Sequence, residues 1–140
     1  VFKTASGRLV GVANLLGRSL MEPVDDPFRA VDAAIAQVAP HTPLLLLDFH
    51  AETTSEKAAM GWHVDGRLSA VVGTHTHIPT ADERILPGGT AFLTDVGMCG
   101  PADSVLGMAV EGVLAKFTTG MPQRFEVASG RCVLSGVRIE

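Results

Sequence analysis

Several features that would assign this chain to a special class are scarce or missing. It holds only two cysteines, Cys99 and Cys132, and they form no CxxC or other zinc-type spacing. Two cysteines in a chain of this size are typical of reduced thiols, with a disulfide left open as an alternative. No apolar run approaches the ~18 residues that a membrane span needs. The first residues also lack the apolar core of a signal peptide. We therefore expect a cytoplasmic protein without a membrane partner.

Clusters of positive charge are missing as well. The eleven Lys and Arg residues are scattered, and the formal net charge is −4. Broad binding to nucleic acid relies on clustered Lys and Arg, so the sequence argues against that class of function. A small anionic substrate stays open, because a bound metal ion would dominate the local electric field.

The composition is that of a folded protein. Hydrophobic residues make up 46% and charged residues 19% of the 140 residues, which favours a globular chain over a disordered one. The length fits one domain or a piece of a larger one. The chain begins at Val1 rather than at a methionine and enters a strand-like stretch almost at once. We therefore expect residues 1–140 to be a single, partial domain.

The first half of the sequence alternates between strand and helix patterns. The predicted elements are a strand at 8–17, a helix at 27–38, a strand at 43–50, a helix at 54–63 and a strand at 69–73. Asp26 is expected to cap the first helix, with Pro27 at its first position. Thr53 and Glu56 have the spacing of a capping box at the start of the second helix. This order of elements predicts an α/β fold.

The second helix has a predicted inner face made of Ala58, Ala59 and Trp62. After the third strand the pattern changes to a mostly β half. Its predicted elements are a hairpin of 82–86 and 90–94, a glycine-rich loop at 95–101, a short helix at 109–117, and strands at 125–128 and 133–139 joined at 129–130.

Three histidines follow the ends of predicted buried strands. His75 and His77 follow the strand of residues 69–73, and His50 ends the strand of residues 43–50. If the chain leaves its strand still extended, both His75 and His77 point to the same side. Imidazole is the commonest side-chain metal ligand, and ligands in α/β sheets sit beyond the carboxyl ends of the strands. The pattern predicts a metal site, whereas His41 and His63 are expected at the surface.

Acidic residues near these histidines are candidates for supporting roles. Asp48 shares a face with His50, and Asp48 or Glu52 can orient a ligating imidazole through its second nitrogen. Asp95 follows a strand and can reach the same end of the sheet, or it can be a plain turn residue before Gly97. The three imidazoles fit either a catalytic zinc site with an open position or part of a two-metal site.

Long stretches of the chain resemble a known family. The motifs are DFHAETTSEK at 48–57, GR at 66–67, VVGTHTH at 71–77, TAD at 80–82, LPGG at 86–89 and TDVGM at 94–98, with NLLGR at 14–18 and PFRA at 27–30. They closely resemble the YmdB-like metallophosphoesterases, which are bacterial members of the calcineurin-like phosphoesterase superfamily. The resemblance covers essentially the whole chain.

The resemblance implies a β-sandwich flanked by helices, in α/β/β/α layers, with two divalent metal ions at one edge. Iron or manganese is the expected metal, and the expected substrate is a small phosphodiester, notably a 2′,3′-cyclic nucleotide. His50 and His75 would bind one ion and His77 the other. Asp48, Glu52 and Asp95 would support these ligands or the phosphate. The ions would activate water and hold the phosphate oxygens. A homo-oligomer is expected.

The motifs of the family's N-terminal half are not present in residues 1–140. They carry an aspartate, a Glu-Asn pair and an Asn-His pair, which include the bridging ligand and a candidate proton donor. The chain therefore resembles the C-terminal half, and we expect the proton donor upstream of Val1. Such a fragment should bind metal weakly, be inactive alone and expose apolar surface at its sheet. The alternatives are a mononuclear amidohydrolase-type enzyme and a non-enzymatic regulatory or scaffold protein.

Overall fold

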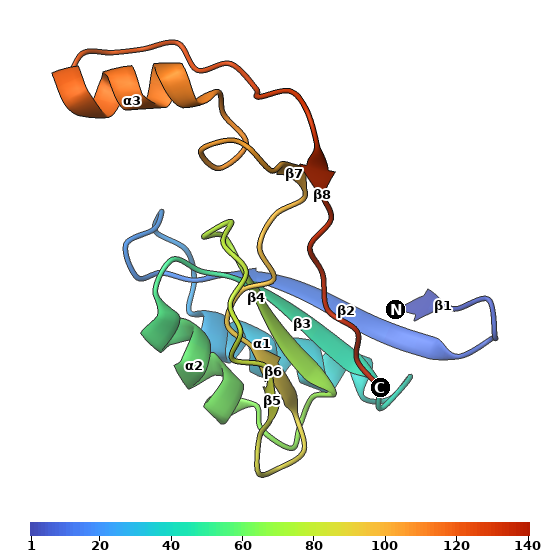
Figure 1. Ribbon diagram of the computed structural model, residues 1–140. Coiled ribbons are helices and arrows are strands. Elements are labelled where there is room, and N and C mark those ends of the chain that lie inside the picture. The colour runs from blue at the N-terminus through green and yellow to red at the C-terminus, as the bar shows by residue number, and fades with distance from the viewer.

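A mostly parallel sheet forms the centre of the computed structural model, which describes residues 1–140 (Figure 1). Its six strands lie in the order β1-β2-β3-β4-β6-β5. They are β1 Phe2–Lys3, β2 Leu9–Leu16, β3 Leu45–His50, β4 Ala70–Thr74, β6 Ala91–Leu93 and β5 Arg84–Ile85. The four inner strands are parallel, while β1 and β5 pair antiparallel at the two edges. The predicted α/β class is confirmed.

Both predicted helices of the first half are present. Helix α1 spans Pro27–Val38, and the Asp26 side chain accepts a hydrogen bond from the Phe28 amide at 2.9 Å, as expected of an N-cap. Helix α2 spans Thr54–His63, but the Thr53 side chain makes no capping bond. The predicted capping box is wrong because the Glu56 carboxylate instead accepts from the backbone amides of Arg18 and Ser19, in the loop after β2.

The inner face of α2 also differs from the prediction. The buried residues of the helix are Lys57, Met60 and Gly61, whereas Trp62 is 54% exposed. The predicted face of Ala58, Ala59 and Trp62 is therefore wrong. The helix is turned so that the lysine, a residue type that is rarely buried, points into the protein, where it meets a carboxylate described below.

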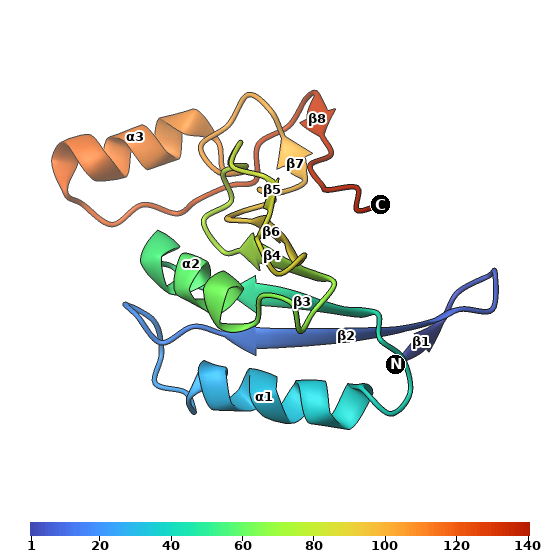
Figure 2. The same cartoon turned by 90° about the horizontal axis from the view of Figure 1, so that it is seen from below.

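One face of the sheet carries the hydrophobic core. Leu47, Phe49 and Val71 project from β3 and β4 and pack with Val31 of α1 and Met60 of α2. Both helices therefore cover the same face, and α1 runs alongside β2 (Figure 2). Phe49 is fully buried, a burial that stabilises the fold by about 1.5–3 kcal/mol. Side chains at alternate positions face the other side of the sheet.

That other face is open at β2. Val12 is 45% exposed and Leu16 is 44% exposed, although both belong to a strand in the interior of the sheet order. Val72 of β4 also points to this side but is buried. A pocket of about 340 Å³ lies on the same sheet between β4, β5 and β6 and the end of the chain, at 137–140. The structure thus shows one layer of helices on one sheet.

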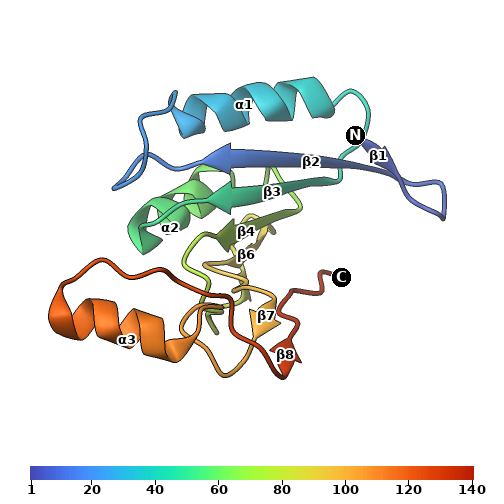
Figure 3. The same cartoon turned by 90° about the horizontal axis from the view of Figure 1, so that it is seen from above.

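Helix α3 and a small two-stranded sheet lie apart from this core, whereas the end of the chain at 137–140 returns to the main sheet. Helix α3 spans Val110–Thr119 and ends at Gly120, whose φ of 70° is left-handed; it lies far from α1 (Figure 3). Strand β7, Gly100–Pro101, pairs antiparallel with β8, Cys132–Val133. Neither sulfur is in a disulfide. None of the helices is long and apolar enough to cross a membrane.

Predictions for this region were mixed. The hairpin of β5 and β6 and the helix are confirmed within a few residues. The predicted strands at 125–128 and 133–139 and the turn joining them are wrong, because only a single bridge between Val127 and Met108 and the two-residue strand β8 form. Their apolar residues alternate as in a strand, but most are exposed, and pairing is limited to Val127 with Met108 and to β8 with the two-residue strand β7. The longest element of the second half is a helix rather than a strand.

Candidate metal centre

Polar side chains gather where β3 and β4 end. His50 is the last residue of β3 and Thr74 the last of β4, and the two are paired in register. Asp48 lies two residues before His50, so both side chains face the open side of the sheet, opposite Phe49. Asn14 of β2 is in register with Asp48. The parallel register therefore brings four polar side chains to one edge of one face.

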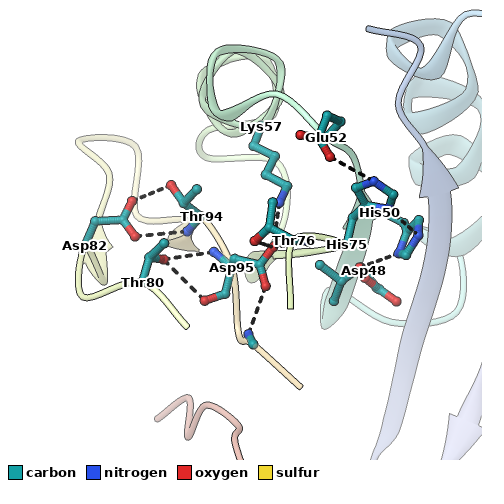
Figure 4. Close-up of polar contacts among 12 residues, drawn as sticks. Asp48, His50, Glu52, Lys57, His75, Thr76, Thr80, Asp82, Thr94 and Asp95 are labelled. Carbon is teal, nitrogen blue, oxygen red and sulfur yellow. Dashed lines mark hydrogen bonds and ion pairs between the residues drawn. The ribbon is translucent and has the colours of Figure 1, made fainter. Parts of the chain in front are cut away.

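A chain of hydrogen bonds fixes the orientation of the His50 ring (Figure 4). The Asn14 amide donates to Asp48 Oδ2 at 2.8 Å, and the Thr74 hydroxyl donates to Asp48 Oδ1 at 2.7 Å. The Thr74 oxygen lies 3.0 Å from His50 Nδ1. Because the only hydroxyl proton of Thr74 points to Asp48, its oxygen accepts from His50 Nδ1–H. This assignment leaves the lone pair of His50 on Nε2, directed away from the sheet.

His75 faces that lone pair. Its Nδ1 lies 3.0 Å from His50 Nε2, and the two rings meet edge to face, with centroids 4.8 Å apart and planes at 81°. On its other side, His75 Nε2 lies 3.0 Å from Glu52 Oε2, which favours a proton on Nε2. Two imidazole nitrogens, His50 Nε2 and His75 Nδ1, thus converge. Their 3.0 Å separation suits two adjacent ligands on one ion with metal–nitrogen bonds of about 2.1 Å.

His77 does not join this pair. The chain leaves its extended conformation after Thr74, and both His75 and His77 have positive φ, at 110° and 68°. The expectation that the two histidines share an extended segment is therefore wrong. His77 is exposed and makes no hydrogen bond with the other two rings. Within residues 1–140, no three His, Cys, Asp or Glu side chains converge as a complete metal site. The residues present offer two imidazole ligands in place, with His77 exposed two residues after His75.

Asp95 lies on the inner side of the same loop rather than at the rings. Its carboxylate is buried and accepts from Lys57 Nζ at 2.7 Å, from the Thr76 amide at 3.0 Å and hydroxyl at 2.7 Å, and from the Gly97 amide at 2.9 Å. Burial would raise the pKa of Asp95, but these bonds, led by the one from Lys57, outweigh it and lower the pKa below its ordinary value. Asp95 combines the turn contact with an internal ion pair.

The remaining predicted residues lie either beside the two rings or at the surface of the protein. Asp48 reaches His50 through Thr74, and Glu52 contacts His75 rather than His50. His41 is exposed, and His63 lies at the surface, 3.1 Å from Asp32. Both surface predictions are confirmed.

Sequence reasoning missed Asn14, Thr74 and Lys57. Asn14 and Thr74 are neutral side chains within apolar strands, and only the register reveals their contacts. For Lys57 a signal existed: it lies three and four residues before Met60 and Gly61, which is the helical spacing of one face.

The fold and the paired imidazoles define an α/β protein with a candidate metal centre at the carboxyl ends of its strands. The model of the YmdB-like protein family matches residues 1–140. The chain belongs to this family, as its motifs indicate.

Relatives with names or structures extend this result. The chain is 57% identical over 136 residues to the 2′,3′-cyclic-nucleotide 2′-phosphodiesterase of Bacillus subtilis, covering 97% of this chain and 52% of that protein. A crystal structure of a hypothetical protein from Thermus thermophilus matches with a TM-score of 0.81 and 48% identity, covering 86% of this chain and 47% of the other. A crystal structure described as a novel phosphatase from Mycoplasma pneumoniae matches with a TM-score of 0.75 and 44% identity, covering 84% and 42%. The chain spans about half the length of these relatives.

Proposed function

We propose that the protein is a metal-dependent phosphodiesterase that hydrolyses 2′,3′-cyclic nucleotides. The observation that carries the proposal is the pair of imidazole nitrogens, His50 Nε2 and His75 Nδ1, held 3.0 Å apart with their second nitrogens occupied by Thr74 and Glu52. The name of the Bacillus subtilis relative, at 57% identity, supports the substrate class. Neither the fold alone nor a pair of histidines would specify a substrate.

We expect a pair of divalent ions, iron or manganese, to bind here together with ligands from outside residues 1–140. In this proposal His50 and His75 bind one ion and His77 binds the other. When bound, such ions stabilise the charge of the phosphate oxygens and generate a nucleophile from water near neutral pH. Thr74 and Glu52 hold the two rings in the tautomers that offer a lone pair at the site. The other ligands and the proton donor would come from a segment outside residues 1–140, consistent with relatives about twice as long.

The open face of the sheet is part of the same proposal. Val12 and Leu16 are each more than two-fifths exposed on the face that also carries Asp48 and His50. Apolar residues on an inner strand are stabilising only when covered. We infer that a second sheet from outside residues 1–140 packs here and completes α/β/β/α layers. That arrangement would also place further ligands opposite His50. A homo-oligomeric assembly and a cytoplasmic location stay predictions.

The test is turnover of 2′,3′-cyclic AMP by the full-length protein with Mn²⁺ added. His75→Ala should lower kcat/KM by at least about a hundredfold, because an ion that stabilises transition-state charge is worth several kcal/mol. His41→Ala is the matched control, since this histidine lies exposed in a loop away from the site. Undiminished turnover in His75→Ala would contradict the metal assignment.

Metal analysis separates the alternatives. Two manganese or iron ions per full-length chain support the dinuclear site. One tightly bound zinc ion per chain would favour a mononuclear hydrolase instead. Metal binding without any turnover of cyclic nucleotides would favour a regulatory or scaffold role.

A further inference from the structure

The loop that carries His75 and His77 is held in an unfavourable conformation. Both histidines have positive φ, with Thr76 between them. A residue other than glycine in such a region costs on the order of 1–3 kcal/mol and persists only where its surroundings hold it. The contacts of the His75 ring with His50 and Glu52 do not involve Thr76. Thr76 is held instead from the inner side of the loop.

The Asp95 carboxylate occupies that inner side (Figure 4). Its Oδ2 accepts from both the backbone amide and the hydroxyl of Thr76, at 3.0 and 2.7 Å. The Asp95 backbone is bonded to the segment that follows His77. The Asp95 amide donates to Thr80 Oγ1 at 2.9 Å, and the Thr80 amide donates back to the Asp95 carbonyl. Asp95 thus clamps Thr76 through two bonds from a rigid position.

Lys57 compensates the charge of this buried carboxylate. Its ammonium lies 2.7 Å from the same Oδ2, and both side chains of the pair are 1% exposed. The lysine stem crosses β4 at Gly73, where an added Cβ would lie 3.1 Å from Lys57 Cδ and 1.7 Å from the Thr94 carbonyl oxygen. Glycine in the VVGTHTH motif is required by the close approach of the Thr94 carbonyl, in the residue before Asp95, and it also leaves room for the lysine stem.

A buried ion pair is weak evidence for stability, because packed apolar residues of similar volume often stabilise as much. An apolar pair, however, offers no acceptor for Thr76. We propose that Lys57 and Asp95 are positioning residues, whose buried ion pair holds Thr76 and thereby sets the placement of His75 and His77. The part of this inference that concerns metal binding rests on the proposed function. The part that concerns the loop stands on the contacts alone.

Amide hydrogen exchange tests the loop directly in the full-length protein. Asp95→Asn should speed exchange of the Thr76 amide by about tenfold to a hundredfold more than it speeds exchange of amides that open only by global unfolding. This is the effect of losing a hydrogen bond to a charged group. The matched control is Asp65→Asn, because Asp65 also accepts from a loop amide, that of Gly88. It should speed exchange at Gly88 and leave Thr76 unchanged. Unchanged Thr76 exchange in Asp95→Asn, or an equal increase in Asp65→Asn, would overturn the inference.

Mn²⁺ titration of the same protein tests the consequence for the histidines. Thr76→Val removes one of the two bonds to Asp95 and should weaken Mn²⁺ binding about tenfold, in the range found for residues that orient metal ligands. Thr76→Ser keeps the hydroxyl and should bind within about twofold of the wild type, a rescue that a purely structural role would not give. Equal binding by Thr76→Val overturns the positioning role. Absence of Mn²⁺ binding by the wild type refutes the proposed function, while the exchange experiment still decides the role of the pair in the loop.

Discussion

The loop of residues 75–77 separates two polar networks that differ in one respect. On the outer side, His75 and Glu52 are 33% and 45% exposed. The facing nitrogens, His50 Nε2 and His75 Nδ1, contact only each other, and a bound metal ion could replace that contact. On the inner side, Lys57 and Asp95 are 1% exposed, and the Asp95 carboxylate accepts hydrogen bonds from Lys57, Thr76 and Gly97. The same loop thus connects an accessible network with spare lone pairs to a buried and saturated one.

This difference assigns distinct duties to the two sides. A buried charge that loses its partner destabilises the fold, whereas a half-exposed imidazole that loses its partner mainly changes ligand geometry. Substitutions on the inner side should therefore act chiefly on stability and loop order. Substitutions on the outer side should act chiefly on metal affinity.

The largest effect is expected from Lys57→Met. The variant leaves the Asp95 carboxylate buried without its cation, and such uncompensated charges cost about 3–5 kcal/mol. Urea unfolding of the full-length protein measures the loss in the free energy of unfolding. The double variant with Asp95→Asn should recover at least about 1 kcal/mol, because no unpaired charge then remains. A loss below about 1 kcal/mol in Lys57→Met would show that solvent reaches the pair.

The second largest effect is expected from acid, which protonates buried carboxylates and lowers the free energy of unfolding. The pKa of Asp95 is lowered because bonds from Lys57, Thr76 and Gly97 outweigh its burial, and the pKa of Asp82 is lowered because bonds from Thr80 and Thr94 outweigh its burial. A lowered pKa contributes stability that is present above the ordinary value of 3.8 and is lost as the pH falls toward the folded-state pKa. Urea unfolding from about pH 6 to about pH 2.5 should show this decline.

Asp95→Asn provides the comparison for the acid experiment. The amide does not titrate, so the decline below pH 3.8 should become shallower than in the wild type, with the shares of Asp82 and Asp32 remaining because their pKa values are also lowered. Equal slopes in the two proteins would show that Asp95 is not the group that binds the proton.

The outer network was more predictable from sequence than the inner one. His50 and His75 follow apolar runs that end in polar residues, and the topology of α/β sheets places such ends at one edge. Asn14 and Thr74 join them only through the in-register pairing of parallel strands, which residue patterns do not encode. The change of backbone conformation after Thr74 could not be predicted either, because positive φ is rare for histidine.

The inner network conflicts with hydropathy. Hydropathy places Trp62 inside and Lys57 outside, but the buried carboxylate of Asp95 reverses this choice and rotates α2. Lys57 is buried because Asp95, 38 residues further along the chain, is there to pair with it. A local sequence pattern contains no information on so distant a partner. The strands expected at 125–128 and 133–139 failed for a related reason, because alternation alone supplies no neighbouring strand to pair with.

Thr74→Val tests the outer network at its centre. The change keeps the shape of the side chain but cuts the link between Asp48 and His50 Nδ1, so the ring is free to turn. Mn²⁺ affinity of the full-length protein should fall about tenfold to a hundredfold. Thr118→Val is the matched control, because Thr118 donates only to the carbonyls of Leu114 and Ala115 within exposed α3. An equal loss of affinity in both variants would contradict a specific role for Thr74.

The smallest effect on stability is expected from Glu52→Gln. The side chain is 45% exposed, so the free energy of unfolding should change by no more than about 0.5 kcal/mol. The amide still accepts from His75 Nε2–H but without a charge, which makes the ring a weaker metal ligand. Mn²⁺ titration should therefore show a modest loss of affinity, smaller than that of Thr74→Val, in a protein of unchanged stability. A fall in stability comparable to that of Lys57→Met would mean that the outer network also supports the fold, and the contrast between the two sides of the loop would be lost.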